Sequence, residues 1–589
     1  MPQPYLPPLP LMRLAMSQAA RTTGADSLEG YRGVLDELAG PVLESAARLA
    51  AEVLAPLNSA GDRSPSRRES GQVITPPGFV AAYRRFREDG WVSLGAPVQY
   101  GGQGLPLLLA GATTEIWGGA NLAFAMCPEL AVGALEVLKA HAPAALAYEY
   151  GPRIASGEYT SAMCLTEPQA GSDLSALTTR AEPDGASWRL FGRKIFISWG
   201  EHDLSDNIVH FVLARAPGAP PGLRGISLFL VPRKVTGAAG ALEDNDIHAL
   251  SLEHKMGIRA SPTCVMALGA GAGARGWLLG ELHAGLACMF TMMNHMRLGV
   301  GLHSVGLAER ALQLARSHAR ERVQGRNATG RQQPIIEHAD VRRMLLMMKS
   351  LTHAARALAY TGAASLDVAR AAADDGERCA AASRAELLTP VIKAWCSDVA
   401  VEVASLGVQV HGGIGFIEDA EISQVYRDAR IGPIFEGTNY MQAQDLLRRK
   451  VIRDRGAALE DLLAAMDSAA RELPADPAQS LAPLRAGLLA GTARLRAAAA
   501  DLAARAAGEP ELIGATAHHF LQWTGVLAGA WQWALAARGA LELVGPSGLR
   551  PITDAAAFYA AHVLPRAHAH ELIVRDGART VTEALITEL

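Results

Sequence analysis

One acidic residue of the sequence, Glu436, lies in a setting that could present a carboxylate for chemistry. It precedes a glycine in residues 432–439, which read GPIFEGTN, and stretches with helical spacing flank this segment. A loop framed by helices would hold the carboxylate. From the residues alone, Glu436 is either a functional acid or a solvated loop acid.

Two earlier segments carry small, hydroxyl and aromatic residues that suit a flat polar ligand. Residues 163–173 read MCLTEPQAGSD, in which Gly and Ser allow close backbone approach and hydrogen bonding. Residues 194–200 read KIFISWG and place an aromatic and a hydroxyl side chain in one strand. Taken alone, the first could be an ordinary turn and the second a core strand. Together with the Glu436 loop, and in this order, they are far more specific.

Two other motifs are interpreted as unrelated to the chemistry. Residues 271–276 read GAGARG, but no alternation of strands and helices surrounds this dinucleotide-like spacing, so we expect a surface loop. The histidines near the end of the chain lack the i, i+4 spacing plus a third ligand of a helix-borne zinc site; they are His518, His519, His568 and His570. We expect surface histidines there and predict no metal.

The elements that must position the candidate residues change in type along the chain. After an N-terminal extension, residues 1–34, helical spacing in residues 35–158 predicts an α domain. Short β-branched and aromatic runs in residues 159–275 predict a β domain. Long helical periodicity in residues 283–450 predicts a four-helix bundle, and Ala-rich residues 460–589 predict an additional helical domain. The expected fold class is mainly α with a central β domain.

Composition narrows the class of protein. The 589 residues are 49% hydrophobic and 5% aromatic, which favours helices, and 55 Lys and Arg against 59 Asp and Glu supply no broad basic surface for nucleic acid. Six cysteines without a CxxC pair favour a reducing compartment. The opening residues lack a signal-peptide pattern, and no long uncharged apolar run predicts a membrane span. We therefore expect a cytoplasmic protein.

Taken together, the motifs resemble those of the acyl-CoA dehydrogenase family over about residues 35 to 450. The matching patterns are TEP-x-AGSD, K-x-aromatic-I-S, KMGIRAS, Q-x-x-GG and FEGT. The chain looks most similar to the larger members, which add a C-terminal helical domain, and the segment after residue 450 supports this. The resemblance implies an α domain, a β domain and a four-helix domain that enclose FAD and an acyl-CoA.

The resemblance also implies roles for individual residues. FAD would contact Leu165, Thr166, Ser172, Phe196, Ile197, Ser198, Arg322, Gln409, Gly412, Gly413 and Thr438, with Arg322 reaching the FAD of a neighbouring subunit. Ser172, Arg297 and Gly437 would contact the substrate. Glu436 would take the α-proton while the β-hydrogen leaves as hydride to FAD, giving a trans-2-enoyl-CoA as in the β-oxidation of fatty acids. A homodimer or homotetramer that passes electrons to an electron transfer flavoprotein is implied.

The chain differs from many members of that family at four positions. Phe196 stands where Trp is common, Trp199 where Asn is common, Asn294 where an acidic residue is frequent, and Ala339 where many have Gln. Two alternative functions would use the same framework: an acyl-CoA oxidase that passes electrons to oxygen, and a non-catalytic flavoprotein that binds DNA or a partner. Glu436 and the lack of a basic balance argue against the second.

Overall fold

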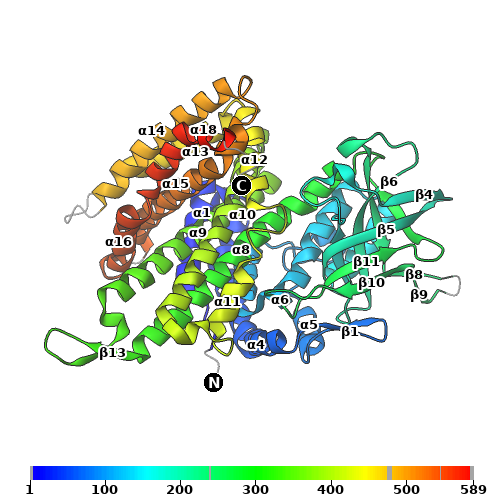
Figure 1. Cartoon of the computed structure of the whole chain (residues 1–589), viewed down its shortest axis with the longest axis horizontal. Coiled ribbons are helices and arrows are strands. Elements are labelled where there is room, and N and C mark those ends of the chain that lie inside the picture. Colours follow the sequence, from blue (N-terminus) through cyan, green and yellow to red (C-terminus); the bar gives the residue numbers. More distant parts are fainter. Residues whose placement is uncertain (1–3, 238–239, 474–480, 544, 584–589) are drawn as a thin grey trace. The chain divides into compact units, whose positions relative to one another are not determined.

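The computed structural model describes residues 4–237, 240–473, 481–543 and 545–583 of the chain (Figure 1). These residues form two compact units. The first comprises Met1–Ala47, Pro106–Gly119 and Arg297–Leu589, and the second comprises Arg48–Leu105 and Ala120–Met296. Three of the four boundaries between the units lie inside helices, namely α3 (Ala39–Leu49), α6 (Leu107–His141) and α8 (Gly285–Glu321).

The second unit contains the predicted β region, which the structure confirms as a sheet of eight strands. Hydrogen-bonded neighbours follow the order β10, β11, β5, β12, β7, β6, β3, and β4 pairs with β5 and β6. The strands are β3 (Tyr159–Cys164), β4 (Arg180–Asp184), β5 (Ser187–Ser198), β6 (Asn207–Arg215), β7 (Ile226–Pro232), β10 (Ile247–Leu252), β11 (Thr263–Leu268) and β12 (Ala274–Leu279). β6 and β7 are buried along almost their whole length, as their continuous apolar runs predict. Short helices precede the sheet in this unit: α4 (Ala55–Arg63), α5 (Phe79–Glu88) and α7 (Ala144–Ala155).

The first unit is helical, as the long periodic segments predict. Helices α9 (Ala339–Ala371) and α10 (Asp375–His411) lie side by side, and α1 (Leu9–Thr23) from the predicted N-terminal extension packs against α9 (Figure 1). Two short helices, α11 (Glu421–Ala429) and α12 (Asn439–Gln444), follow α10.

The predicted additional domain is helical in its described part, and α15 packs against α12, α9 and α10. Residues 474–480, 544 and 584–589 of that predicted domain lie outside the described residues. Its helices are α13 (Ala457–Arg471), α14 (Ala482–Arg505), α15 (Leu512–Leu543), α16 (Gly545–His562), α17 (Arg566–Leu572) and α18 (Ala578–Thr582).

The long helix α6 is apolar enough to cross a membrane by length and composition, a property that our sequence analysis did not single out. However, 83% of its apolar window is buried inside the protein, as in a core helix. Near the middle, Asn121 leaves the helical conformation (φ −163°, ψ 90°) and caps the continuation by accepting a hydrogen bond from the Phe124 backbone at 3.1 Å. The apolar residues of α6 therefore serve the protein interior.

The two motifs that sequence analysis set aside have structural roles. The backbone N–H groups of Gly271 and Gly273 donate to Asp246 Oδ2 at 2.8 and 3.0 Å, and the segment continues as strand β12 rather than a helix. This excludes the dinucleotide interpretation. Among the histidines, His518 and His568 are exposed as expected, whereas His519 and His570 are half-buried with their Nδ1 atoms 3.1 Å apart, which corrects the expectation for these two.

A buried charge cluster joins three helices of the first unit. Arg356 of α9 is 1% exposed and donates to Glu115 Oε1 of α6 and to Glu309 Oε2 of α8, each at 2.8 Å. Tyr360 donates to the other oxygen of Glu115 at 2.7 Å, and Gln313 to the other oxygen of Glu309 at 2.9 Å. Each buried carboxylate is thus paired and hydrogen-bonded, the condition under which a buried charge is tolerated.

Candidate active site

Glu436 lies on the loop between α11 and α12, in the first unit. Its backbone has φ +56°, an uncommon left-handed conformation for a residue with a side chain, and Gly437 follows with φ +82°. A Cβ on Gly437 would come within 2.8 Å of Gln442 Nε2, which itself donates to the Glu436 carbonyl at 3.3 Å. The glycine is therefore needed both for its conformation and for space, and the pair of residues fixes a tight turn.

A buried lysine stabilises the turn at Glu436 and Gly437 through hydrogen bonds. Lys393 of α10 is 0% exposed, and its Nζ donates to the Gly437 carbonyl at 2.7 Å and to Asn439 Oδ1 at 2.9 Å. Asn439 in turn donates to Asp398 Oδ1 at 2.8 Å, and Gln522 of α15 donates to the second oxygen of that carboxylate at 2.5 Å. A continuous polar network thus runs from the additional domain to the backbone beside Glu436.

The carboxylate of Glu436 has the electrostatics of a poised base. Burial raises the pKa of Glu436 to about 7, although the charges of Arg297 and Lys393 act to lower it. The side chain is not fully enclosed, and the part of the chain that the structure describes makes no hydrogen bond to its carboxylate oxygens. Such a carboxylate can both hold and release a proton near neutral pH.

Arg297 is the second cation at this loop. It is 7% exposed, and a Cβ on Gly437 would lie 3.9 Å from its Nη2. Burial lowers the pKa of Arg297, while Asp445 and Glu436 act to raise it. The residue expected to hold the substrate therefore lies close to the candidate base.

Lys393→Met should impair the candidate base, Glu436, without removing it. Burial lowers the pKa of Lys393 to about 7, and its remaining positive charge stabilises ionised Glu436. Loss of that charge raises the pKa of Glu436, so the acid limb of the pH profile of kcat/KM shifts to higher pH. A rise of about one pKa unit lowers the ionised fraction at pH 7 from about one half to about one tenth, so we expect kcat/KM to fall about fivefold. Steady-state kinetics across pH check this.

Lys450→Met is the matched control, because Lys450 lies in the same unit and pairs with Glu386 rather than with the Glu436 loop. Its pH profile should match the wild type. A Lys393→Met enzyme with lower activity but an unshifted acid limb would show that Lys393 only maintains the loop's structure.

The flavin candidates of the first unit lie at the ends of α8, α10 and α12. Arg322 is exposed directly after α8, at the base of a hairpin formed by β13 (Val323–Arg326) and β14 (Gln332–Pro334). Gln409 is exposed at the end of α10, where Gly412 turns the chain with φ +64° and the space beside Gly413 is open. Thr438 caps α12 by accepting from the Met441 backbone at 3.3 Å. Open glycines and an exposed arginine fit an anionic, planar cofactor.

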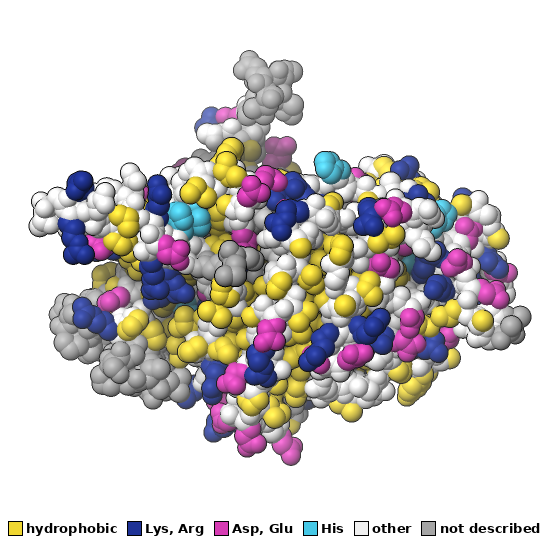
Figure 2. Space-filling model, turned by 90° about the horizontal axis from the view of Figure 1, so that it is seen from below, with side chains coloured by type: hydrophobic (Ala, Val, Ile, Leu, Met, Phe, Trp, Pro, Cys, Tyr) yellow, Lys and Arg dark blue, Asp and Glu magenta, His cyan; other side chains and the backbone are white. Residues whose placement is uncertain are grey.

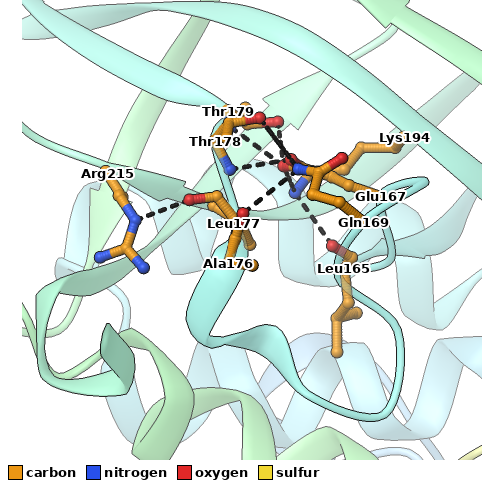
Figure 3. Close-up of polar contacts among 9 residues, drawn as sticks. All are labelled: Leu165, Glu167, Gln169, Ala176, Leu177, Thr178, Thr179, Lys194 and Arg215. Carbon is orange, nitrogen blue, oxygen red and sulfur yellow. Dashed lines mark hydrogen bonds and ion pairs between the residues drawn. The ribbon is translucent and has the colours of Figure 1, made fainter. Parts of the chain in front are cut away.

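In the second unit, Glu167 organises the TEP motif (Figure 3). Its carboxylate accepts hydrogen bonds from the backbone and hydroxyl of both Thr178 and Thr179, from Gln169 and from Lys194 Nζ, at 2.5 to 3.0 Å. Lys194 also donates to the Leu165 carbonyl at 3.0 Å. Glu167 therefore has a structural role, since its hydrogen bonds hold residues 165–179 against β5. The hydroxyls of Thr166 and Ser172 are left for a ligand.

Glu167→Gln should destabilise the protein in a pH-dependent way. Burial alone would raise the pKa of Glu167, but Lys194 and the Thr179 and Thr178 bonds bring it from 4.5 to about 2. A lowered carboxyl pKa contributes stability above pH 4.5 that is lost as the pH falls towards 2. The variant should be about 3 kcal/mol less stable at pH 7. Urea unfolding should show that this difference in the free energy of unfolding between variant and wild type is smaller at pH 3 than at pH 7.

Glu182→Gln is the control, since Glu182 lies on the neighbouring strand β4 in a half-exposed pair with Arg180. It should cost less than about 1 kcal/mol at either pH. A constant difference between Glu167→Gln and wild type from pH 7 to pH 3 would contradict the assignment.

The other flavin candidates of this unit lie around that motif. The Ile195 backbone donates to the Thr166 carbonyl at 2.9 Å, which joins the TEP loop to β5. Phe196 is 59% exposed with φ +59°, whereas Ile197 is 2% exposed and packs in the sheet core, so Ile197 can reach a ligand through its backbone alone. Ser172 is exposed, and Leu165 and Ser198 are partly exposed. An exposed aromatic ring beside hydroxyl groups fits a flat ring system.

Lys393, which the structure places beside the Glu436 turn, is not among the residues predicted from the sequence. A signal was present: Lys393 is a lone cation in the apolar run from Pro390 to Cys396 of a helical segment. Lysine is rarely buried without a partner, so such a residue on an apolar helix face indicates a buried polar contact. Its partners could not be identified without the fold.

Four family models match consecutive parts of the chain. They are the acyl-CoA dehydrogenase N-terminal domain over residues 41–158, the middle domain over 162–269, the C-terminal domain over 283–451, and a model described as acetyl-CoA dehydrogenase C-terminal like over 456–584. The last match spans all of the additional helices, α13 to α18.

Individual proteins give the same result. The 3-methylmercaptopropionyl-CoA dehydrogenase of Ruegeria pomeroyi is 42% identical over 99% of this chain and 100% of its own length. FadE5 of Mycobacterium tuberculosis, a broad-specificity linear acyl-CoA dehydrogenase, is 36% identical over 74% of each chain.

Among solved structures, which show the fold, Caenorhabditis elegans ACDH-11 in complex with C11-CoA has a TM-score of 0.74 at 22% identity, covering 92% of this chain and 93% of that one. An acyl-CoA dehydrogenase from Bacillus anthracis, complexed with FAD, has a TM-score of 0.72 at 22% identity and covers 98% of this chain and 92% of that one.

Proposed function

The chain belongs to the acyl-CoA dehydrogenase family, whose cofactor is FAD, and on that premise we propose that Glu436 is the base that removes the α-proton of the acyl-CoA. The observation that carries the proposal is a partly buried carboxylate with a pKa of about 7, held on a rigid turn between two cations. The product is the trans-2-enoyl-CoA.

The α-hydrogen of a thioester is too weakly acidic for a carboxylate in water, so the site must stabilise the developing enolate. The backbone N–H of Glu436 suits this task, because no backbone acceptor for it is recorded among the described residues. It can donate to the thioester oxygen while the side chain takes the proton. Bound substrate would exclude water and raise the basicity of the carboxylate further.

The chemistry that bound FAD would supply is a hydride acceptor for the β-hydrogen. In the second unit, Thr166, Phe196 and Ser198 are residues that would hold it. In the first unit, the open Gly412–Gly413 turn would contact FAD, and Arg322 would reach the FAD of a neighbouring subunit. Ser172, Arg297 and Gly437 would contact the acyl-CoA.

The purified protein should carry non-covalently bound FAD and bleach when acyl-CoA is added. The test is the visible absorbance of oxidised flavin, its release on denaturation, and its loss on anaerobic mixing with substrate. A colourless protein that cannot be loaded with FAD, or a flavin that no acyl-CoA bleaches, would contradict the proposal.

An acyl-CoA oxidase would use the same base, so the electron acceptor distinguishes the two functions. We propose that an electron transfer flavoprotein accepts the electrons. The reduced enzyme should reoxidise quickly with purified electron transfer flavoprotein and slowly in air. Rapid peroxide formation in air would instead identify an oxidase.

A non-catalytic flavoprotein that binds DNA is the other alternative. On the face shown in Figure 2, basic and acidic side chains are interspersed rather than gathered into a basic stripe, and the net charge is −4. A gel-shift titration at physiological salt should show no complex.

The choice of substrate is best approached through the relatives. The Ruegeria pomeroyi relative is named for 3-methylmercaptopropionyl-CoA, and we propose that this chain also acts on short acyl-CoAs, including this thioether. The test compares the rates of turnover of these substrates with those of linear acyl-CoAs of increasing length.

We further propose a homodimer or homotetramer in the cytoplasm. The six cysteines are free, five of them buried, as expected in a reducing compartment.

A further inference from the structure

A cavity lies within the first unit, among residues to which the proposed dehydrogenation assigns no role. It has a volume of about 460 Å³, within the roughly 300–1,000 Å³ of small-molecule sites. The N-terminal segment and helices α8, α9, α15 and α16 form its walls. Most of the lining side chains are apolar, among them Leu6, Leu11, Leu312, Leu346, Trp533 and Ile552. Leu6 and Leu346 are 65% and 38% exposed, so the apolar surface continues outward.

One buried side chain in this lining lacks polar partners. His353 is 3% exposed, its ring lies 4.6 Å from that of Trp533, and neither of its ring nitrogens has a hydrogen-bond partner among the described residues. Burial lowers the pKa of His353 to about 3, with Arg356 and Lys349 acting in the same direction, so the ring is neutral. A neutral imidazole offers one donor and one acceptor, and buried polar groups are nearly always satisfied. A guest with a polar head would satisfy it.

The free charge around the cavity is positive. Three cations line it, namely Arg316, Arg342 and Lys349, and none of them forms an ion pair with another described residue. Asp554 acts on Lys349 only at longer range and pairs with Arg550 at 3.8 Å. The one carboxylate that the described residues bring to the lining, Glu309, accepts hydrogen bonds from Arg356 and Gln313. The cavity therefore favours an anion over a neutral or cationic head group.

We propose that this cavity binds a medium-chain aliphatic carboxylate, with its chain against the apolar walls and its head among His353, Lys349 and Arg316. The neutral ring of His353 donates one hydrogen bond to the carboxylate, and the two cations balance its charge. The mostly apolar walls favour an aliphatic chain over a sugar or nucleotide. This ligand site is independent of the Glu436 loop and does not depend on the proposed function.

The test is calorimetric titration of the FAD-loaded full-length protein with decanoate below its micellar concentration. Decanol and decylammonium are the controls for charge. We expect one decanoate site per chain, at least tenfold weaker binding of decanol and no binding of decylammonium. Equal affinity for decanol, or no saturable binding of decanoate, would overturn the proposal.

Variants locate the site. Lys349→Met should weaken decanoate at least tenfold, and His353→Leu should weaken decanoate but not decanol. Arg343→Met, on the same helix but outside the lining, should change neither. If His353→Leu folds poorly, Leu346→Trp at the exposed rim serves as a second variant, since its larger ring should block entry.

Two further outcomes would also overturn the proposal. Decanoate binding that is lost when Glu436→Gln enzyme is saturated with acyl-CoA would place the ligand in the catalytic site. Absent binding, together with a change of oligomeric state in Leu346→Trp by analytical ultracentrifugation, would show that a second copy of the chain covers this face.

Discussion

Glu436→Gln is expected to abolish turnover while FAD and acyl-CoA still bind. The amide keeps the size of the side chain but cannot accept the α-proton. Removal of a general base costs about 10²- to 10⁴-fold, roughly 3 to 5 kcal/mol of transition-state stabilisation. The loss should lie at the upper end, because Arg297 and Lys393, the charged neighbours that act on Glu436, are cations. Flavin content, acyl-CoA affinity and the rate of flavin bleaching should be measured on one preparation.

Glu377→Gln is the matched control, an identical substitution of an exposed glutamate in the first turn of α10. It should retain wild-type rates. If Glu436→Gln were fully loaded with FAD and still bleached at a near-normal rate, another residue would be the base. If it lost FAD or stability in proportion to activity, Glu436 would be a structural loop acid.

Arg356→Met is expected to lower the free energy of unfolding by about 3 to 5 kcal/mol, more than the other stability variant proposed above. The substitution leaves the carboxylates of Glu115 and Glu309 buried at 0% and 5% exposure without their shared cation. Burial already raises the pKa of Glu115 even with Arg356 present. The midpoint of urea unfolding, followed by circular dichroism, measures the loss.

Arg343→Met is the control, because it removes an exposed arginine from the same helix, α9. Arg343 is 45% exposed and pairs with Asp340 at 2.8 Å, and such surface pairs are worth about 0 to 1 kcal/mol. The unfolding midpoint should barely move. A similar small loss for Arg356→Met would mean that the helices hold together by apolar packing alone. Replacing Arg356, Glu115 and Glu309 together by apolar residues should recover part of the stability, because no charge is then left unpaired.

Several features of the fold could be predicted from the sequence because they depend on local properties. Ala-rich periodic segments form helices wherever they pack, so the helical character of α9, α10 and α13 to α15 follows from composition and spacing. The β-branched runs of β6 and β7 likewise predict buried strands. The FEGT and TEP motifs indicated the family, since their glycines and hydroxyls are needed at fixed chain positions.

The roles of individual residues within those motifs depended on distant partners. Glu167 looked like part of a ligand loop, but Lys194, 27 positions away, makes it a structural anchor. Thr438 caps α12, and Ile197 packs in the sheet core. None of this follows from spacing, because the strands and helices that meet these side chains are chosen by tertiary packing.

By itself, the sequence determined the order of helical and β segments, the family motifs and the identity of the candidate base. Only the tertiary structure decided that Lys393, 44 positions before Gly437, would hold the turn of Glu436, and that His353 would line an apolar cavity beside Trp533. The physical reason is that the pKa of a side chain and the completeness of its hydrogen bonds depend on burial and on neighbours within a few ångströms. Folding brings those neighbours from distant parts of the chain.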